Sequence, residues 1–246
     1  VRMTALHAWF ATPLGRYALA CEQRYIDHAV ADIFGYYAVQ VGMPDVPFLR
    51  ESRIPWKGVV GEQGNVAVGC VPFHLPFANQ SLDLVLLPHV LDFSPQPHQV
   101  LREVERVLVP EGRAVLTGFN PYSLWGMARR LKNQQCPPWQ GRFIALHRLK
   151  DWLRVLSLEP AGGAFLCYRP PFEGEAWLAR CAFMEDAGDR WWPAAAGVYG
   201  LEVIKRVHGM RLLTPRWQTY APRALAVPVG SKRDGRLIHT ETPDDL

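Results

Sequence analysis

The chain lacks the features that would place it in a membrane or in a disulfide-bonded class. Its five cysteines contain no C-x-x-C pair, which argues against both a disulfide framework and a zinc knuckle. The longest apolar stretch, residues 82–93, is interrupted by charged residues and a proline and is shorter than the roughly 20 residues that a membrane span needs. The first apolar stretch is broken at His7, Pro13 and Arg16, so we expect no secretory signal, no membrane partner and a cytoplasmic protein.

Several catalytic signatures are also missing. The sequence has no G-x-S-x-G elbow, no G-x-x-x-x-G-K-[ST] phosphate loop and no G-x-G-x-x-G dinucleotide loop. Its eight histidines show no H-x-H or H-E-x-x-H spacing, so we expect no metal site. The net charge of +4 is too small to favour general binding of nucleic acid.

Positive charge is nevertheless concentrated in one segment. Between residues 129 and 154 one acid, Asp151, stands among seven basic residues: Arg129, Arg130, Lys132, Arg142, Arg148, Lys150 and Arg154. Such a segment attracts anions, although a solvated helix face is the structural alternative. We therefore expect a small-molecule substrate, with an anionic one as a hypothesis and nucleic acid as the less favoured partner.

Aromatic residues are plentiful, with nine Trp, eight Tyr and eleven Phe, and they can form a substantial core. Apolar runs typical of buried strands alternate with helical patterns, as in residues 81–87, 97–108 and 113–119. This alternation predicts an α/β fold of the Rossmann-like, doubly wound kind: a mostly parallel sheet with helices on both faces and an antiparallel last strand. Ligands of such sheets bind at the carboxyl ends of the strands.

The expected domain organisation is a single domain over residues 1–213. It comprises an N-terminal helix over 12–35 and a core over 36–121. A substrate-side segment over 122–146 and an insertion over 170–196 follow, and both are candidates for a lid. Residues 214–246 are rich in proline and mixed in charge, and we expect a surface arm or a disordered tail there.

Three stretches carry a family resemblance. The segment HLPFANQSLDLVLLPHVLDF, residues 74–93, resembles the central motif of class I S-adenosylmethionine-dependent methyltransferases of the type 11 kind. LREVERVLVPEGR, residues 101–113, and TGFNP, residues 117–121, resemble that family's following helix, turn and strand. The resemblance implies S-adenosylmethionine as the cofactor and assigns no catalytic residue.

The loop that holds the cofactor in that family is altered here. The family ends its first strand with an acid and a Gly-x-Gly turn, because glycine lets the backbone approach the cofactor. The corresponding stretch is VQVGMP, residues 39–44, in which Gln40 replaces the acid, Gly42 is kept and Pro44 replaces the second glycine. Proline fixes φ and removes an N–H group, so the loop is not the standard one.

Glu62 is the candidate for the cofactor's ribose. Such folds hold both ribose hydroxyls with an acid at the end of the second strand, and Glu62 follows the strand expected over 57–61. A solvated turn carboxylate is the alternative. Only three residues separate this strand from the next one, expected as a buried strand over 66–71, and a parallel crossover needs a dozen or more. Either these strands are misassigned or the adenine side of the pocket is reduced.

The remaining candidates come from the central motif. His74 and Leu75 are placed by the resemblance at the adenine side of the site, with core packing as the alternative, favoured for Leu75. Leu87, Pro88 and His89 lie at the carboxyl end of the expected strand over 81–87, where they either line the pocket or close it.

Two hypotheses of function follow. The first is an S-adenosylmethionine-dependent methyltransferase that acts on a small, in one hypothesis anionic, acceptor. The second is a non-catalytic binding or regulatory protein of the same fold that has lost standard cofactor binding. Gln40, Pro44 and the short connection after Glu62 motivate this second hypothesis.

Overall fold

The computed structural model describes residues 2–131, 138–172 and 174–207. The strands are β1 (Tyr37–Val41), β2 (Trp56–Gly61), β3 (Val68–Gly69), β4 (Leu82–Pro88), β5 (Leu108–Phe119), β6 (Leu158–Leu166) and β7 (Val198–Lys205). The helices are α1 (Arg2–Phe10), α2 (Pro13–Ala31), α3 (Val90–Phe93), α4 (Pro97–Val107), α5 (Leu124–Leu131), α6 (Leu146–Val155), α7 (Glu175–Arg180) and α8 (Met184–Trp191), with a 3-10 turn at Pro193–Ala195.

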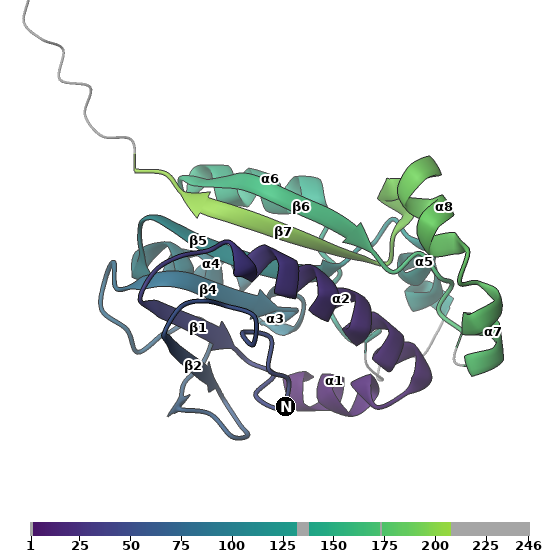
Figure 1. Cartoon of the computed structure of the whole chain (residues 1–246), viewed down its shortest axis with the longest axis horizontal. Helices are drawn as coiled ribbons and strands as arrows, with labels where there is room; N and C mark the ends of the chain where they lie inside the picture. Colours follow the sequence, from purple (N-terminus) through teal and green to yellow (C-terminus); the bar gives the residue numbers. More distant parts are fainter. Residues whose placement is uncertain (1, 132–137, 173, 208–246) are drawn as a thin grey trace, which may run out of the picture. The chain divides into compact units, whose positions relative to one another are not determined.

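The described strands form one sheet in the order β3-β2-β1-β4-β5-β7-β6 (Figure 1). Strand β7 runs antiparallel to both β5 and β6, and the other neighbouring pairs are parallel. The predicted Rossmann-like sheet with an antiparallel last strand is therefore confirmed. The order reverses between β1 and β4, so this gap is the switch point at which sheets of this kind bind ligands.

Two apolar layers cover the sheet. Leu84 and Leu86 of β4 are buried among side chains from α1, α2 and the loop after β1. Val85 and Leu87 point to the other face, where they join the buried side chains of α4 and α6. Because neighbouring residues of a strand face opposite sides, the continuous apolar run over 82–88 is what a strand covered on both faces requires.

The N-terminal helix begins as expected and ends early. The Thr12 hydroxyl accepts a hydrogen bond from the Gly15 N–H at 3.1 Å and caps α2. The helix ends at Ala31, so the expectation that it reaches Gly35 is wrong. Gly35 instead lies against Asp83, since a Cβ on Gly35 would come within 2.3 Å of the Asp83 Cβ. The Asp83 carboxylate accepts from the N–H groups of residues 36 and 37 at 2.7 and 2.9 Å, and it fixes the start of β1.

The third expected strand is much reduced. Only Val68 and Gly69 pair with β2, and both are exposed, so the expected buried strand over 66–71 is wrong. The connection after Gly61 is too short to hold a crossover helix. The chain instead folds back beside β2, where the Cys70 N–H donates to the Gly61 carbonyl at 2.9 Å.

The remaining segments carry helices that the sequence pattern does not specify. Helix α1 precedes the expected N-terminal helix, α5 lies in the substrate-side segment, and α7 and α8 lie in the insertion over 170–196. In the described part of the chain no helix is long and apolar enough to cross a membrane. The predicted tail over 214–246 lies outside the described residues, and the domain limits stay predictions.

We expect Gly35→Ala to lower the free energy of unfolding by about 1–3 kcal/mol, because the new methyl group displaces the Asp83 side chain that holds the start of β1. Urea denaturation measures the change. Gly69→Ala is the matched control, since a Cβ there meets no atom within 4 Å, and it should stay within about 0.5 kcal/mol of the wild type. Equal stability of the two variants would contradict the close approach at Gly35.

Candidate functional site

A cavity of about 430 Å³ opens at the carboxyl edge of the sheet. It lies at the ends of β1, β2 and β4, next to the switch point, and α1 contributes one side chain, His7. The cavity is lined by residues 42–45, 61–64, 72, 90 and 93–95 together with His7. We call this cavity the edge pocket.

Gln40 organises the loop that forms one wall of the edge pocket. Its side chain is buried, and its amide nitrogen donates to three loop carbonyls at 2.8–3.0 Å, those of Gly42, Met43 and Val46. Gly42 has a φ of 76° and Met43 one of 51°, so the loop turns through two left-handed residues. The Gln40 amide holds this turn, and an acid at this position could not donate to carbonyls. Its side-chain oxygen is buried without a hydrogen-bond partner among the described residues.

Pro44 of this loop packs against the loop that follows β2. A Cβ placed on Gly64 would come within 2.5 Å of the Pro44 ring, so the two loops are in contact. Pro44 therefore packs against the neighbouring loop and lines the edge pocket at the same time.

Glu62 lies in the edge pocket at the end of β2, and its side chain is exposed. It forms no hydrogen bond or salt bridge to the part of the chain that the structure describes. The pKa of the nearby Cys70 thiol is raised, chiefly by burial of the thiol and secondly by the negative charge of Glu62. The carboxylate is thus available to a ligand, as the sequence hypothesis requires.

His74 and Leu75 lie outside the edge pocket. His74 is exposed and packs its ring against Phe73, with 5.3 Å between the ring centroids. Leu75 is buried in the apolar layer under α4, and its N–H donates to Glu103 at 3.1 Å. Its position agrees with the core-packing alternative, and Pro72 is the nearby residue that lines the edge pocket.

Leu87, Pro88 and His89 are fully buried beneath the edge pocket and do not line it. The chain reaches the pocket just after them, through Val90, Phe93 and Ser94. The sequence left open whether these three residues line the pocket or close it, and their burial fits the second alternative.

His89 is the centre of a buried charged cluster. Its Nε2 lies 2.8 Å from a carboxylate oxygen of Glu22 on α2, and its Nδ1 lies 3.0 Å from Asp92. The same Asp92 oxygen accepts from the Phe119 N–H at 3.0 Å, at the end of β5. Burial alone lowers the pKa of His89, but the charges and hydrogen bonds of Glu22 and Asp92 outweigh it and raise that pKa to about 9. Burial raises the pKa of Asp92, against the hydrogen bond from His89.

Aromatic side chains fill the space beyond the end of β5. Phe119 stacks on the His89 ring at a centroid distance of 4.1 Å and on Phe143 at 4.9 Å. Trp125 of α5 and Trp139 pack beside them, and all are buried. The free volume at this edge therefore lies over β1, β2 and β4.

Two residues of the edge pocket, His7 and Asp45, were absent from the sequence-based candidates. Their side chains are 3.3 Å apart, from His7 Nε2 to Asp45 Oδ2, and both are about half exposed. Because they stand far apart in the sequence and α1 has no clear pattern, no local signal pairs them. In the described residues, no three His, Cys, Asp or Glu side chains form a group that would hold a metal ion.

Comparisons with known proteins identify the fold. Residues 56–116 match a family model described as "Methyltransferase domain". "Uncharacterized protein YafS" of Escherichia coli (strain K12) is 31% identical over 160 residues, which cover 64% of this chain and 67% of the relative.

Two solved structures illustrate the structural likeness. The crystal structure of a SAM-dependent methyltransferase from Thermotoga maritima, described as a possible histamine N-methyltransferase, has a TM-score of 0.60 at 16% identity, with 81% of this chain and 94% of that chain covered. Geranyl diphosphate C-methyltransferase from Streptomyces coelicolor A3(2), in complex with Mg²⁺, geranyl diphosphate and S-adenosyl-L-homocysteine, has a TM-score of 0.50 at 15% identity, with 75% and 79% covered.

The chain belongs to the class I S-adenosylmethionine-dependent methyltransferase family, whose cofactor is S-adenosylmethionine. The sequence resemblance over residues 74–121 is thereby confirmed at the level of the family.

The buried cluster predicts a pH-dependent stability. His89 has a pKa of about 9 in the folded chain against about 6.5 when unfolded, so its stabilisation is complete below about pH 6.5 and is lost as the pH rises through 9. Denaturation in urea between pH 6 and pH 10 should show a fall of up to about 3 kcal/mol in the free energy of unfolding.

Glu22→Gln should reduce this fall, because it removes one of the two carboxylates that raise the pKa of His89. The exposed Glu51→Gln is the control and should keep the wild-type fall. An identical fall in wild type and Glu22→Gln would show that Glu22 does not stabilise the imidazolium.

Proposed function

We propose that this protein transfers a methyl group from S-adenosylmethionine, bound in the edge pocket, to a small-molecule acceptor. The observation that carries the proposal is the pocket at the switch point of the sheet. At the end of β2 it contains the Glu62 carboxylate, which forms no hydrogen bond or salt bridge to the described residues. The cofactor supplies a methyl group already activated on a sulfonium, so the protein needs no nucleophile of its own and contributes mainly alignment.

The residues present fit the cofactor. Glu62 would accept hydrogen bonds from the ribose hydroxyls. Gly42, with its positive φ, would let the loop backbone approach the cofactor, and Gln40 would hold that loop in place. The unpartnered side-chain oxygen of Gln40 is a further acceptor near this loop.

The other candidates from the central motif keep supporting roles in the proposal. Leu87, Pro88 and His89 would hold in position the residues after β4 that line the pocket. Leu75 would hold the segment that places Pro72 at the pocket, and His74 would contact the cofactor's adenine only from the rim.

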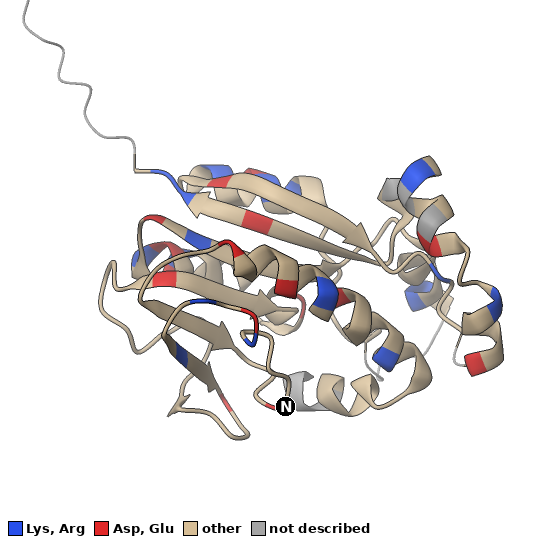
Figure 2. Ribbon diagram, viewed as in Figure 1, with Lys and Arg blue, Asp and Glu red and all other residues tan. Residues whose placement is uncertain are grey.

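An anionic acceptor is the finer part of the proposal. Arg129 and Arg130 of α5 lie on the segment that leaves the carboxyl end of β5. Arg130 is exposed, whereas the Arg129 guanidinium donates to the Trp139 carbonyl at 3.0 Å and lies over Phe143. In the view of Figure 2, Lys and Arg are interspersed with Asp and Glu along the helices, which favours local attraction of a small anion over a nucleic-acid surface.

The alternative is a non-catalytic protein of the same fold. It is favoured by Pro44 in the place of a family glycine and by the aromatic packing around Phe119, which fills the space beyond β5. Binding of the cofactor with no transfer to any acceptor would fit this alternative.

Calorimetry should show binding of S-adenosylmethionine and of S-adenosylhomocysteine to the wild-type chain. Glu62→Gln should weaken both by about 10- to 150-fold, which corresponds to the roughly 1.5–3 kcal/mol of charge-assisted hydrogen bonds. Glu51→Gln, an exposed carboxylate outside the edge pocket, should bind as the wild type does.

Folded protein that gives no heat and no thermal shift at millimolar ligand would overturn the proposed function. Unchanged affinity in Glu62→Gln, with binding intact in the wild type, would remove Glu62 from the ribose while leaving the function standing.

The basic residues generate a separate prediction. Replacing Arg129, Arg130 and Lys132 by Ala should raise the KM of a small anionic acceptor several-fold and flatten its salt dependence, with cofactor affinity unchanged, because charges at the rim act by screened attraction. The control replaces Arg148, Lys150 and Arg154 of α6, which removes the same charge elsewhere. Equal effects of the two triple variants would contradict a specific role for the first set of basic residues. Retention of an oligonucleotide on filters at low salt, lost in the first variant alone, would favour nucleic acid instead.

A further inference from the structure

His7 and Asp45 form a polar pair inside an otherwise largely apolar section of the edge pocket. His7 comes from α1 and Asp45 from the loop after β1, and both line the cavity. The His7 Nε2 lies 3.3 Å from the Asp45 carboxylate, close to hydrogen-bond distance. When Nε2–H faces the carboxylate, the neutral imidazole carries its lone pair on Nδ1, which has no partner among the described residues.

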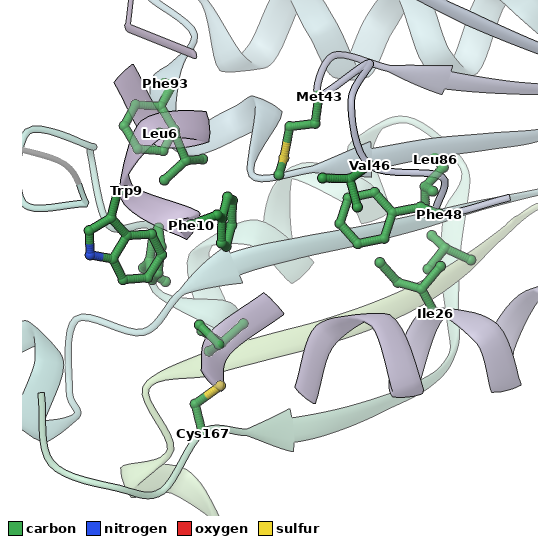
Figure 3. Packing of buried hydrophobic residues seen from close by; sticks show 14 of the residues in the cluster. Leu6, Trp9, Phe10, Ile26, Met43, Val46, Phe48, Leu86, Phe93 and Cys167 are labelled. Atoms are coloured by element: carbon green, nitrogen blue, oxygen red, sulfur yellow. The ribbon is translucent and has the colours of Figure 1, made fainter. Parts of the chain in front are cut away.

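Helix α1 is anchored so that His7 stays at the pocket. Its neighbours Leu6, Trp9 and Phe10 are 0%, 8% and 4% exposed and belong to the apolar layer on this face of the sheet. Figure 3 shows Leu6 beside Phe93 of α3, with Met43 of the β1 loop on the same side of the core. The backbone on either side of His7 is therefore held by packing, while about half of the His7 side chain remains exposed.

The position of the pair relative to Glu62 indicates which end of the cofactor it faces. Glu62 lies at the end of β2, on the outer side of β1, and would take the ribose. The Asp45 loop follows β1, and α1 packs on α3, which follows β4. His7 therefore lies over the gap between β1 and β4, where the sulfonium end of a cofactor held at Glu62 would lie.

We propose that His7, oriented by Asp45, is the base that removes the acceptor's proton during methyl transfer, so that the acceptor is a hydroxyl or amine that carries this proton. This inference rests on the proposed function and names the acceptor class for the same site. As the bond from the acceptor's oxygen or nitrogen to the methyl carbon forms, the bond from that carbon to sulfur breaks and leaves its electron pair on sulfur. The acceptor's proton passes to Nδ1 of His7 and then to solvent.

The buried histidine of this edge, His89, is unsuited to the task. Both ring nitrogens of His89 are engaged, by Glu22 and Asp92, and its side chain is 0% exposed. Glu62, the further carboxylate of the pocket, lies at the ribose end. Of the described histidines, His7 is the one that lines the edge pocket.

A test of this role needs no knowledge of the acceptor. S-adenosylmethionine carries a positive sulfonium and S-adenosylhomocysteine is neutral, so the two ligands differ in charge at the reacting centre. A base close to the methyl group holds its proton less tightly beside the cation. The Coulomb interaction weakens with the distance between the two charges, so a lower midpoint indicates that the base lies near the sulfonium.

The experiment is an NMR titration of the whole chain labelled in histidine, in complex with each ligand in turn, with the His7 signal assigned by its loss in His7→Gln. We expect the His7 midpoint to be lower by one pH unit or more in the S-adenosylmethionine complex. The exposed His28 on α2, which lies outside the edge pocket, is the internal control and should titrate identically in both complexes.

The outcomes separate this inference from the proposed function. Equal His7 midpoints in the two complexes would overturn the role of His7 while leaving cofactor binding intact. A His7→Gln variant that binds both ligands ten-fold more weakly would also overturn it, since His7 would then hold the cofactor itself. Failure of the wild-type chain to bind either ligand would overturn the proposed function and the inference together.

Discussion

The contact between His89 and its two carboxylates determines how the ligand edge of this molecule is built. Glu22 extends from α2, Asp92 from α3, and Asp92 also accepts from the backbone at the end of β5. One buried imidazole thus joins a covering helix to the ends of the two central strands. The remaining carboxylate oxygens of Glu22 and Asp92 have no partner among the described residues. Burying these charges therefore costs free energy, and removing one member of the cluster would leave another charge buried without its partner. The residues after β4 line the edge pocket because this cluster holds the strand end below them.

Much of the fold was predictable because its signals are local. The continuous apolar run of β4 and the amphipathic pattern of α4 specify buried elements by periodicity alone. Where the prediction was wrong, the causes differ. The helix expected over 12–35 ends at Ala31 and Gly35 packs on Asp83, a contact that is distant in sequence. The strand expected over 66–71 is reduced to two residues, as the short connection noted in the sequence already indicated.

The same distinction holds for the site. Gly42 and Glu62 were candidates from the sequence, because each follows a recognisable strand, and both line the edge pocket. His7 and Asp45 were not found, since their proximity depends on how α1 packs. His89 was found for its place in the motif, but its partner Glu22 stands on another helix and no spacing rule connects them. The contacts of the loop after β1 also depend on the folded structure: the Gln40 amide donates to carbonyls to which an ionised carboxylate could not donate, and Pro44 packs on Gly64.

The way α1 is attached separates the two sides of the edge pocket. The loops after β1 and β2 are continuous with the sheet, whereas α1 is held by the apolar side chains of Leu6, Trp9 and Phe10. Substitutions along α1 can therefore change the lining of the edge pocket around His7 without altering the backbone of the loops after β1 and β2. The two sides can change separately, because they share a cavity but not a backbone segment.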